Sequence, residues 1–175
     1  LYAKHKVANE EFLISLKSKV DYCPTILRFS TAFGLSDRMR FDLTINQFTL
    51  QLANKNVIEV YDKDTWRPYC HVKDFAILID KVLNASEDKV SFEIFNAGST
   101  SNNATKLDII NKINYVLPDI NVKFVDGGSD QRNYKVDFSK VSSVLGFNAI
   151  YDIDYGIKVI IEANKQKLFN DFLAK

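Results

Sequence analysis

Residues 25–29 read TILRF, and this short run decides the fold class. It is apolar enough to be buried on both faces, which is typical of a strand in a parallel sheet covered by helices. Outward from this run, the hydrophobic spacing predicts helices over 1–20, 42–53 and 139–145, and from Asp74, Thr105 and Asp154 onward. Further strands are predicted over 57–61, 68–72, 90–96 and 121–125. Strands that alternate with helices indicate an α/β fold with a mostly parallel sheet.

Four of the six predicted helices have an N-terminal capping residue. The expected N-terminal caps are Asp42, Asp74, Thr105 with Asp108 as its capping-box partner, and Asp154. Gly146 is expected to end the helix over 139–145. The side chains expected to point inward include Ala8, Phe12 and Leu16 on the first helix and Phe75, Ile79, Val82 and Leu83 on the helix after Asp74. Residues 30–41 are predicted to be a polar loop.

Composition excludes several classes of protein. A length of 175 residues fits one soluble domain or a large piece of one, and the chain opens on Leu1, so we expect a fragment. A net charge of +1 argues against binding to nucleic acid or to an anionic membrane surface. Cys23 and Cys70 suit reduced cysteines of a cytoplasmic protein, and no metal site is expected. The first glycine is Gly34, so no glycine-rich loop for a dinucleotide pyrophosphate precedes it.

Tyr2 and Lys6 stand four residues apart on the first predicted helix, which places both side chains on one face. A lysine ammonium beside a tyrosine phenol favours the phenolate, and such a pair can transfer a proton at neutral pH. The spacing alone is a weak signal, because a solvated lysine beside a half-buried tyrosine gives the same pattern. The neighbouring blocks of sequence decide between the two interpretations.

Six blocks follow one another along the chain: YAKHK (2–6), LRFSTAFG (27–34), RMRFDL (38–43), WRPYCHVKD (66–74), FNAG (95–98) and DQRNY (130–134). In this order they resemble the second half of the extended short-chain dehydrogenase/reductases, the NAD-dependent epimerases and dehydratases of nucleotide sugars. The resemblance covers nearly the whole chain. It implies the C-terminal part of an NAD(P)-binding Rossmann-like fold together with a smaller substrate-binding subdomain.

The resemblance assigns residues to the cofactor side of a site. It implies that Tyr2 is the catalytic acid/base and that Lys6 hydrogen-bonds the nicotinamide ribose while promoting the phenolate. Both residues therefore also contact the cofactor. The backbone of Phe29 and Ser30 is expected to lie against the nicotinamide. The implied cofactor is NAD, with NADP as the alternative.

The substrate side is implied to bind a nucleoside-diphosphate sugar. Its expected residues are Thr31, Asp42, Leu43, Val60, Tyr61, Arg67, Arg132 and Tyr134. Arg67 and Arg132 match two arginines that hold the diphosphate, a task suited to a planar, permanently charged fork. Thr31 stands where many relatives have asparagine, and Asp62 and Lys63 replace a common Gly-Asp turn, so the identity of the base stays open. His71 is interpreted as structural, ordering the start of the helix after it.

The resemblance also implies an organisation and a reaction. Residues 1–34 are expected to end the Rossmann-like domain and 35–175 to form mainly the substrate-binding subdomain, with 71–99 returning to the Rossmann-like sheet. Transient oxidation at C4 of the sugar leads to epimerisation, as in UDP-glucose 4-epimerase, with 4,6-dehydration and 4-reduction as alternatives. A non-catalytic nucleotide-sugar binding module is a further alternative. Family members commonly form homodimers through the tyrosine-bearing helix, where Leu13, Ile14 and Leu16 lie.

Overall fold

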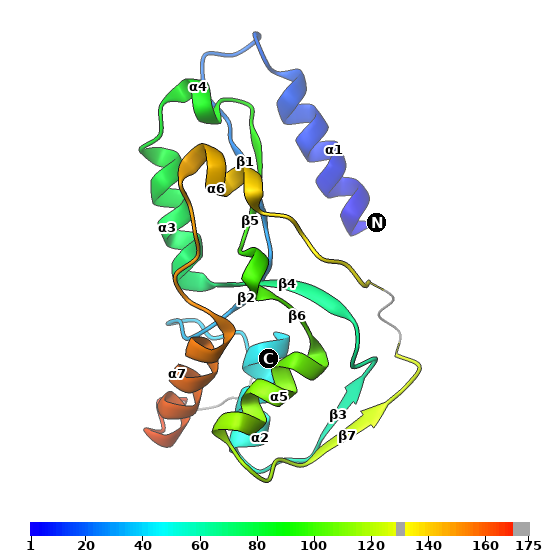
Figure 1. Ribbon diagram of the computed structural model, residues 1–175. Coiled ribbons are helices and arrows are strands. Elements are labelled where there is room, and N and C mark those ends of the chain that lie inside the picture. Colours follow the sequence, from blue (N-terminus) through cyan, green and yellow to red (C-terminus); the bar gives the residue numbers. More distant parts are fainter. Residues whose placement is uncertain (129–131, 170–175) are drawn as a thin grey trace.

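The computed structural model describes residues 1–128 and 132–169. Figure 1 shows an elongated molecule in which one group of elements lies at the top and another at the bottom. Short strands run between the two groups. Each group has its own hydrophobic core, which we call the upper core and the lower core.

The upper core lies beside a pair of parallel strands. β1 (Ile26–Phe29) and β5 (Ile94–Ala97) pair in register from Ile26 opposite Ile94 to Phe29 opposite Ala97. The neighbouring helices are α3 (Val72–Leu83), α4 (Glu87–Val90) and α6 (Ser139–Leu145). The upper core consists of Leu78, Val90, Phe95, Ala97, Phe138, Val141 and Phe147. The predicted strand over 25–29 is thereby confirmed, whereas the one over 90–96 is a helical turn followed by β5.

The middle and lower parts contain two more sheets. β2 (Thr31–Phe33) pairs in parallel with β4 (Trp66–His71), and β4 pairs antiparallel with β6 (Asn103–Thr105). β3 (Ile58–Tyr61) pairs in parallel with β7 (Val122–Val125). The remaining elements are α2 (Thr44–Ala53), η1 (Thr100–Asn102), α5 (Lys106–Val116) and α7 (Ile153–Lys165). Because β2 lies inside the predicted polar loop over 30–41, that part of the prediction is wrong.

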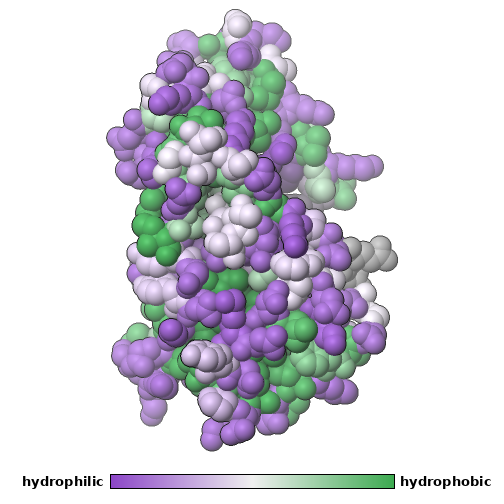
Figure 2. Space-filling view, viewed as in Figure 1, coloured by the Kyte–Doolittle hydropathy of each residue, from purple (hydrophilic) through white to green (hydrophobic). Residues whose placement is uncertain are grey.

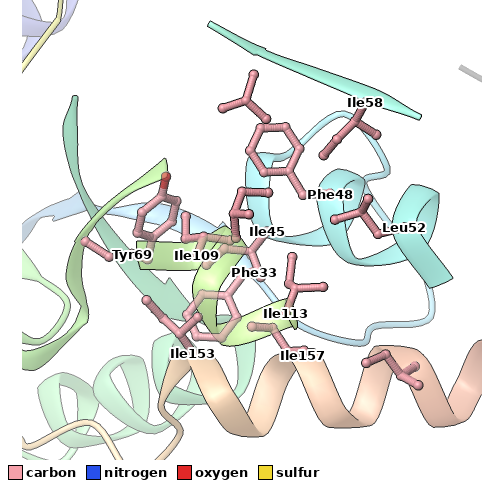
Figure 3. Packing of buried hydrophobic residues seen from close by; sticks show 14 residues of the cluster. Phe33, Ile45, Phe48, Leu52, Ile58, Tyr69, Ile109, Ile113, Ile153 and Ile157 are labelled. Carbon is pink, nitrogen blue, oxygen red and sulfur yellow. The ribbon is translucent and has the colours of Figure 1, made fainter. Parts of the chain in front are cut away.

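The lower core fills the space between α2, α5 and α7. Figure 3 shows Phe33 from β2 beside Ile113 of α5 and Ile153 of α7. The buried members are Phe33, Ile45, Phe48, Leu52, Ile58, Val60, Tyr69, Ala104, Ile109, Ile110, Ile113, Ile153, Ile157 and Ile161. Burying a large aliphatic or aromatic side chain contributes about 1.5–3 kcal/mol, so this core is the main source of stability in the lower part.

Two of the predicted helix ends are confirmed. The Thr105 hydroxyl accepts a hydrogen bond from the Asp108 amide at 3.0 Å, and the Asp108 carboxylate accepts one from the Thr105 amide at 2.8 Å. Gly146 ends α6 with φ +58°, a left-handed conformation that glycine adopts without strain. Both signals are local, so they are readable from a few adjacent residues.

Three predicted N-terminal caps are wrong. The residues that precede the helices are Leu43, His71 and Asp152, in place of Asp42, Asp74 and Asp154 respectively. The predicted carboxylates have other partners: Asp42 pairs with Arg40, Asp74 binds the amides of residues 150–151, and Asp154 pairs with Lys112. Each of these carboxylates therefore binds another partner, either distant in sequence or a nearby arginine, in place of the amides at the start of the helix.

Two apolar helix faces remain exposed. α1 (Tyr2–Ser15) is shorter than the predicted 1–20, and all of its residues are exposed or partly exposed, with Phe12 at 62%. On α3, Ile79 is 43% and Leu83 78% exposed, so their predicted inward orientation is wrong. Figure 2 shows hydrophobic residues among hydrophilic ones on the upper surface. Among the described residues, no helix is long and apolar enough to cross a membrane.

Candidate functional site

The first helix brings Tyr2 and Lys6 together. The Lys6 Nζ lies 5.5 Å from the centroid of the Tyr2 ring, as the four-residue spacing predicts. Tyr2 is 77% exposed, so its hydroxyl is open to a reacting group. The Arg28 Nε donates to both carboxylate oxygens of Glu10, at 2.9 and 3.1 Å, and this contact ties α1 to β1.

Phe29 and Ser30 lie at the carboxyl end of β1. The Phe29 ring packs edge-on against Phe75 at 4.5 Å between centroids. The backbone amide and the hydroxyl of Ser30 both donate to the Ala97 carbonyl, at 3.0 and 2.8 Å. A Cβ on Gly98 would lie 2.3 Å from the Ser30 hydroxyl, so glycine permits this close approach. The carboxyl ends of parallel strands are where open α/β sheets bind ligands.

Thr31 and Arg67 share one face of the β2–β4 pair. Thr31 lies opposite Tyr69 in the register, and Arg67 precedes Tyr69 by two residues on the same strand. Because side chains alternate along a strand, these three residues point to the same side. Arg67 is only 8% exposed, which is unusual for an arginine and requires partners for its guanidinium.

Arg67, Arg132 and Tyr134 form one cluster. The Arg67 guanidinium donates to the carbonyl of Trp66 at 2.8 Å and to the carbonyl of Arg132. Its central carbon lies 5.4 Å from the centroid of the Tyr134 ring, within cation–π range. The Tyr134 amide donates to the Trp66 carbonyl at 3.3 Å. The structure therefore brings together three residues that the sequence could link only through the resemblance.

The same cluster contains residues that the sequence did not single out. The Asn133 side chain accepts a hydrogen bond from the Trp66 amide at 2.9 Å. The Lys135 Nζ lies 3.6 Å from the centroid of the Trp66 ring. Asn103 both donates to the Val136 carbonyl and accepts from its amide, each at 3.0 Å. These contacts hold residues 132–136 along β4 and β6. No short sequence motif predicts these contacts.

Asp42 and Leu43 lie at the start of α2, away from that cluster's contacts. The Arg40 guanidinium forms a bidentate pair with Asp42 at 2.7 Å and lowers the pKa of Asp42 to about 2. Asp42 is therefore ionised near neutral pH. Leu43 precedes the first residue of α2 with extended backbone angles.

Val60 and Tyr61 end β3. The Val60 side chain is buried in the lower core, at 1% exposure, whereas Tyr61 is 42% exposed. The Tyr61 hydroxyl donates to Glu59 at 3.0 Å, and this hydrogen bond to a carboxylate raises the pKa of Tyr61. The Lys106 ammonium donates to the Tyr61 carbonyl at 2.6 Å, linking β3 to α5.

A cavity between residues 35–41, Lys73 and residues 168–169 lies away from these side chains. It measures about 530 Å³ and is lined by Leu35, Ser36, Asp37, Met39, Phe41, Lys73, Leu168 and Phe169. None of the predicted site residues lines it. Within residues 1–128 and 132–169, histidine, cysteine and carboxylate side chains form no group suited to a metal ion.

Solved structures share this fold. UDP-glucuronic acid 4-epimerase from Bacillus cereus, in complex with UDP-glucuronic acid and NAD, matches 96% of this chain with a TM-score of 0.79 and 20% identity. UDP-glucose 4-epimerase from Thermotoga maritima, with UDP-glucose, matches 94% with a TM-score of 0.77 and 18% identity. dTDP-glucose 4,6-dehydratase from Bacillus anthracis, in complex with NAD, matches 96% with a TM-score of 0.79 and 19% identity.

The chain spans about half the length of these solved structures, 53% of each. Their likeness confirms the predicted α/β, Rossmann-like fold. A model of the NAD dependent epimerase/dehydratase family matches residues 1–98, which include Tyr2, Lys6 and the strand over 25–29. With 98 of its 175 residues matched, this chain belongs to the NAD dependent epimerase/dehydratase family.

Proposed function

We propose that this chain is the substrate-side part of a nucleotide-sugar epimerase/dehydratase that oxidises its sugar transiently at C4, as a UDP-glucose 4-epimerase does. The observation that carries the proposal is the contact between Tyr2 and Lys6 within the residues that the family model matches. The length of the solved relatives, of which the chain spans 53%, supports a larger parent enzyme. The exposed apolar faces of α1 and α3 are consistent with further protein packing there.

The residues present suit one end of a dinucleotide. Tyr2 and Lys6 are accessible side chains for a ribose, and the carboxyl end of β1 offers backbone beside Ser30. The first glycine of the chain is Gly34, so the pyrophosphate of NAD, or of NADP as the alternative, would be held by residues outside this sequence. When bound, NAD supplies the hydride acceptor.

Each of the predicted site residues below then has a role in the proposed reaction. Lys6 stabilises the phenolate form of Tyr2, and this phenolate removes the proton from the hydroxyl of the sugar carbon that is oxidised, which converts it to the phenol. Arg67 and Arg132 bind the diphosphate, while Tyr134 packs against the base or ribose. Thr31 donates a hydrogen bond to the substrate from the same face as Arg67. Asp42 and Leu43, just before α2, lie beside the nucleotide. Val60 and Tyr61, at the end of β3, also lie beside it.

The 4-keto sugar formed in this way has three fates. Reduction from the opposite face gives an epimer, loss of water gives the 4,6-dehydratase product, and release makes the enzyme a 4-reductase run in reverse. We propose epimerisation, because it is the broadest class that the visible motifs fit. Residues before Leu1 in the parent protein would decide the class.

The remaining features of the proposal concern organisation. Residues 1–34 end the Rossmann-like domain, 35–175 form mainly the substrate subdomain, and 71–99 return to the Rossmann-like sheet. The parent protein forms a homodimer through α1, where Leu13 and Ile14 are partly exposed. Its location is cytoplasmic, which the two free cysteines support.

The decisive experiment is Tyr2→Phe in the parent enzyme. Loss of the hydroxyl removes the proton acceptor, so kcat should fall by at least 100-fold while the affinity for the sugar nucleotide changes little. Tyr115→Phe is the matched control, because Tyr115 is 86% exposed on α5 and should leave kcat unchanged. An unchanged rate for Tyr2→Phe would eliminate its catalytic role.

The Arg67 cluster favours the binding-module alternative for the chain on its own. Calorimetry of the 175 residues with UDP- or dTDP-hexose and with NAD measures whether the chain binds the sugar nucleotide, the cofactor or both. Sugar-nucleotide binding without NAD binding, lost in Arg67→Met, supports the substrate-side assignment. Tight NAD binding by these residues alone would contradict the proposed division of tasks.

A further inference from the structure

Two segments of the chain cross between the upper and lower cores and touch each other. In the first, β4 contributes Tyr69 to the lower core, and α3 then contributes Leu78 to the upper core. In the second, residues 147–153 lead from Phe147 in the upper core to Ile153 in the lower core. His71 is the last residue of β4 and the N-cap of α3, and Tyr151 lies in the second crossing segment, so their contact joins the two crossings.

The His71 imidazole is surrounded by rings. Its centroid lies 4.9 Å from that of Tyr151, 5.6 Å from that of Tyr155 and 5.2 Å from that of Phe33. A Cβ on Gly34 would lie 2.2 Å from its Nε2, so the ring also packs against bare backbone. His71 is 1% exposed, and it is therefore the central side chain of a junction built from four segments.

The hydrogen bonds of His71 require a neutral ring. Nδ1 accepts from the Lys73 amide at 3.1 Å and so caps the first turn of α3. The proton of a neutral imidazole is then assigned to Nε2. This Nε2 is buried and has no hydrogen-bond partner among the described residues. Protonation would remove the Nδ1 acceptor and place a full charge where no acceptor receives it.

Charged groups near the ring do not compensate for such a charge. The Lys73 ammonium lies 5.5 Å from the Tyr151 ring and repels an imidazolium. The Asp74 carboxylate already accepts from the amides of Ile150 at 2.9 Å and Tyr151 at 3.1 Å. Asp152, the N-cap of α7, accepts from the Tyr155 amide, and Asp154 on α7 pairs with Lys112. On β4, the buried Cys70 thiol has a pKa raised by burial to about 12 and stays neutral.

We propose that His71 is an acid-sensitive latch: in its neutral form it fastens the start of α3 to residues 151–155, and its protonation releases the junction between the two cores. Burial, with a smaller contribution from Lys73, lowers the pKa of His71 to about 4 from an ordinary value near 6.5. The folded protein then binds fewer protons than the unfolded chain between these two values. The latch is complete above pH 6.5 and weakens as the pH falls toward 4.

Asp74 acts in the opposite direction. Burial raises its pKa above the ordinary value of 3.8, even though two amides hydrogen-bond the carboxylate. Its protonation on acidification therefore favours the folded state, in the window between its raised pKa and the ordinary value of 3.8.

The chain offers a direct test, because His5 is its one other histidine. With a single other histidine to distinguish, we expect the NMR signals of His71 to stay those of a neutral imidazole to about pH 4 while the protein is folded. Between pH 7 and pH 4 the protonation of His71 in the unfolded chain should by itself raise the unfolding equilibrium constant by roughly 100-fold, since each pKa unit approaches a factor of ten. A His71 signal that titrates near pH 6.5 in the folded protein would overturn the proposal.

His71→Gln keeps a side-chain acceptor for the Lys73 amide but cannot take up a proton. Its stability should fall much less between pH 7 and 5 than that of the wild type, whereas His5→Gln should follow the wild-type curve. Hydrogen exchange at the amides of residues 73 and 150–151, corrected for intrinsic rates, should rise at pH 5 in the wild type and not in His71→Gln. If His71→Gln fails to fold, the wild-type NMR titration still decides. Equal pH dependence in all three proteins would refute the latch.

Discussion

Gly34→Ala is the sharpest test of the junction between the two cores. Gly34 follows β2 with φ +103°, a conformation that side chains with a Cβ rarely adopt. An alanine Cβ there would lie 2.2 Å from the His71 Nε2 and 2.4 Å from its Cδ2. The substitution therefore adds backbone strain and forces the buried imidazole to move.

The size of the effect follows from these two terms. Strain at an unfavourable φ lowers the free energy of unfolding by about 1–3 kcal/mol. Overpacking a filled interior lowers it by about another 1–3 kcal/mol. Together they predict a loss of roughly 2–6 kcal/mol, a large share of the roughly 5–15 kcal/mol of a typical domain. At about 2–4 °C per kcal/mol, the midpoint of thermal unfolding should fall by roughly 4 to 24 °C.

Gly127→Ala is the matched control. Gly127 has φ +87°, but an added Cβ there would meet nothing within 4 Å, so this variant should show the strain alone. The difference between the two variants, measured by thermal unfolding under circular dichroism, reports the contact with His71. Gly34→Ala should also be partly rescued by His71→Ala, with a coupling of at least about 1 kcal/mol. A Gly34→Ala protein as stable as Gly127→Ala, with no rescue, would refute the packing described for His71.

Three further substitutions probe other parts of the chain. Ile157→Ala, at a fully buried position of the lower core, should lower the free energy of unfolding in urea by about 2–5 kcal/mol, whereas Ile150→Ala, at 70% exposure, should change it by less than about 0.5 kcal/mol. Thr105→Ala removes the capping box of α5 and should reduce stability by about 1 kcal/mol; an unchanged urea midpoint would argue against the cap. Glu10→Gln breaks the pair with Arg28 and should accelerate amide exchange across α1 while global stability changes by less than about 1 kcal/mol. Slow exchange retained in α1 would mean that other contacts hold the helix.

Structural features that depend only on residues close together in the sequence were predictable. The capping box of Thr105 and Asp108, the Gly146 helix end and the contact between Tyr2 and Lys6 all follow from spacings of four residues or fewer. The order of strands and helices followed from hydrophobic periodicity, and the family resemblance added the gathering of Arg67, Arg132 and Tyr134. The functional roles of these residues stay predictions.

Features that depend on distant partners were not predictable. Asp74 looks like a helix cap in the sequence, yet it binds amides 76 and 77 residues away. Phe12 and Leu83 belong to apolar stripes, and such a stripe shows which face a helix would bury without showing what covers it. The Asn133 and Asn103 contacts likewise join segments whose proximity only the folded chain reveals.

The pairing of β1 with β5 has a consequence for how the chain folds as it is made. Ile26 pairs with Ile94, so 94 − 26 = 68 further residues must be synthesised before the first strand meets its partner. At about 5–20 residues per second on a ribosome, that delay is roughly 3–14 s. Throughout this interval the TILRF run lacks β5, the strand with which it pairs among the described residues. The part of the upper core that needs both strands can therefore form only after that delay.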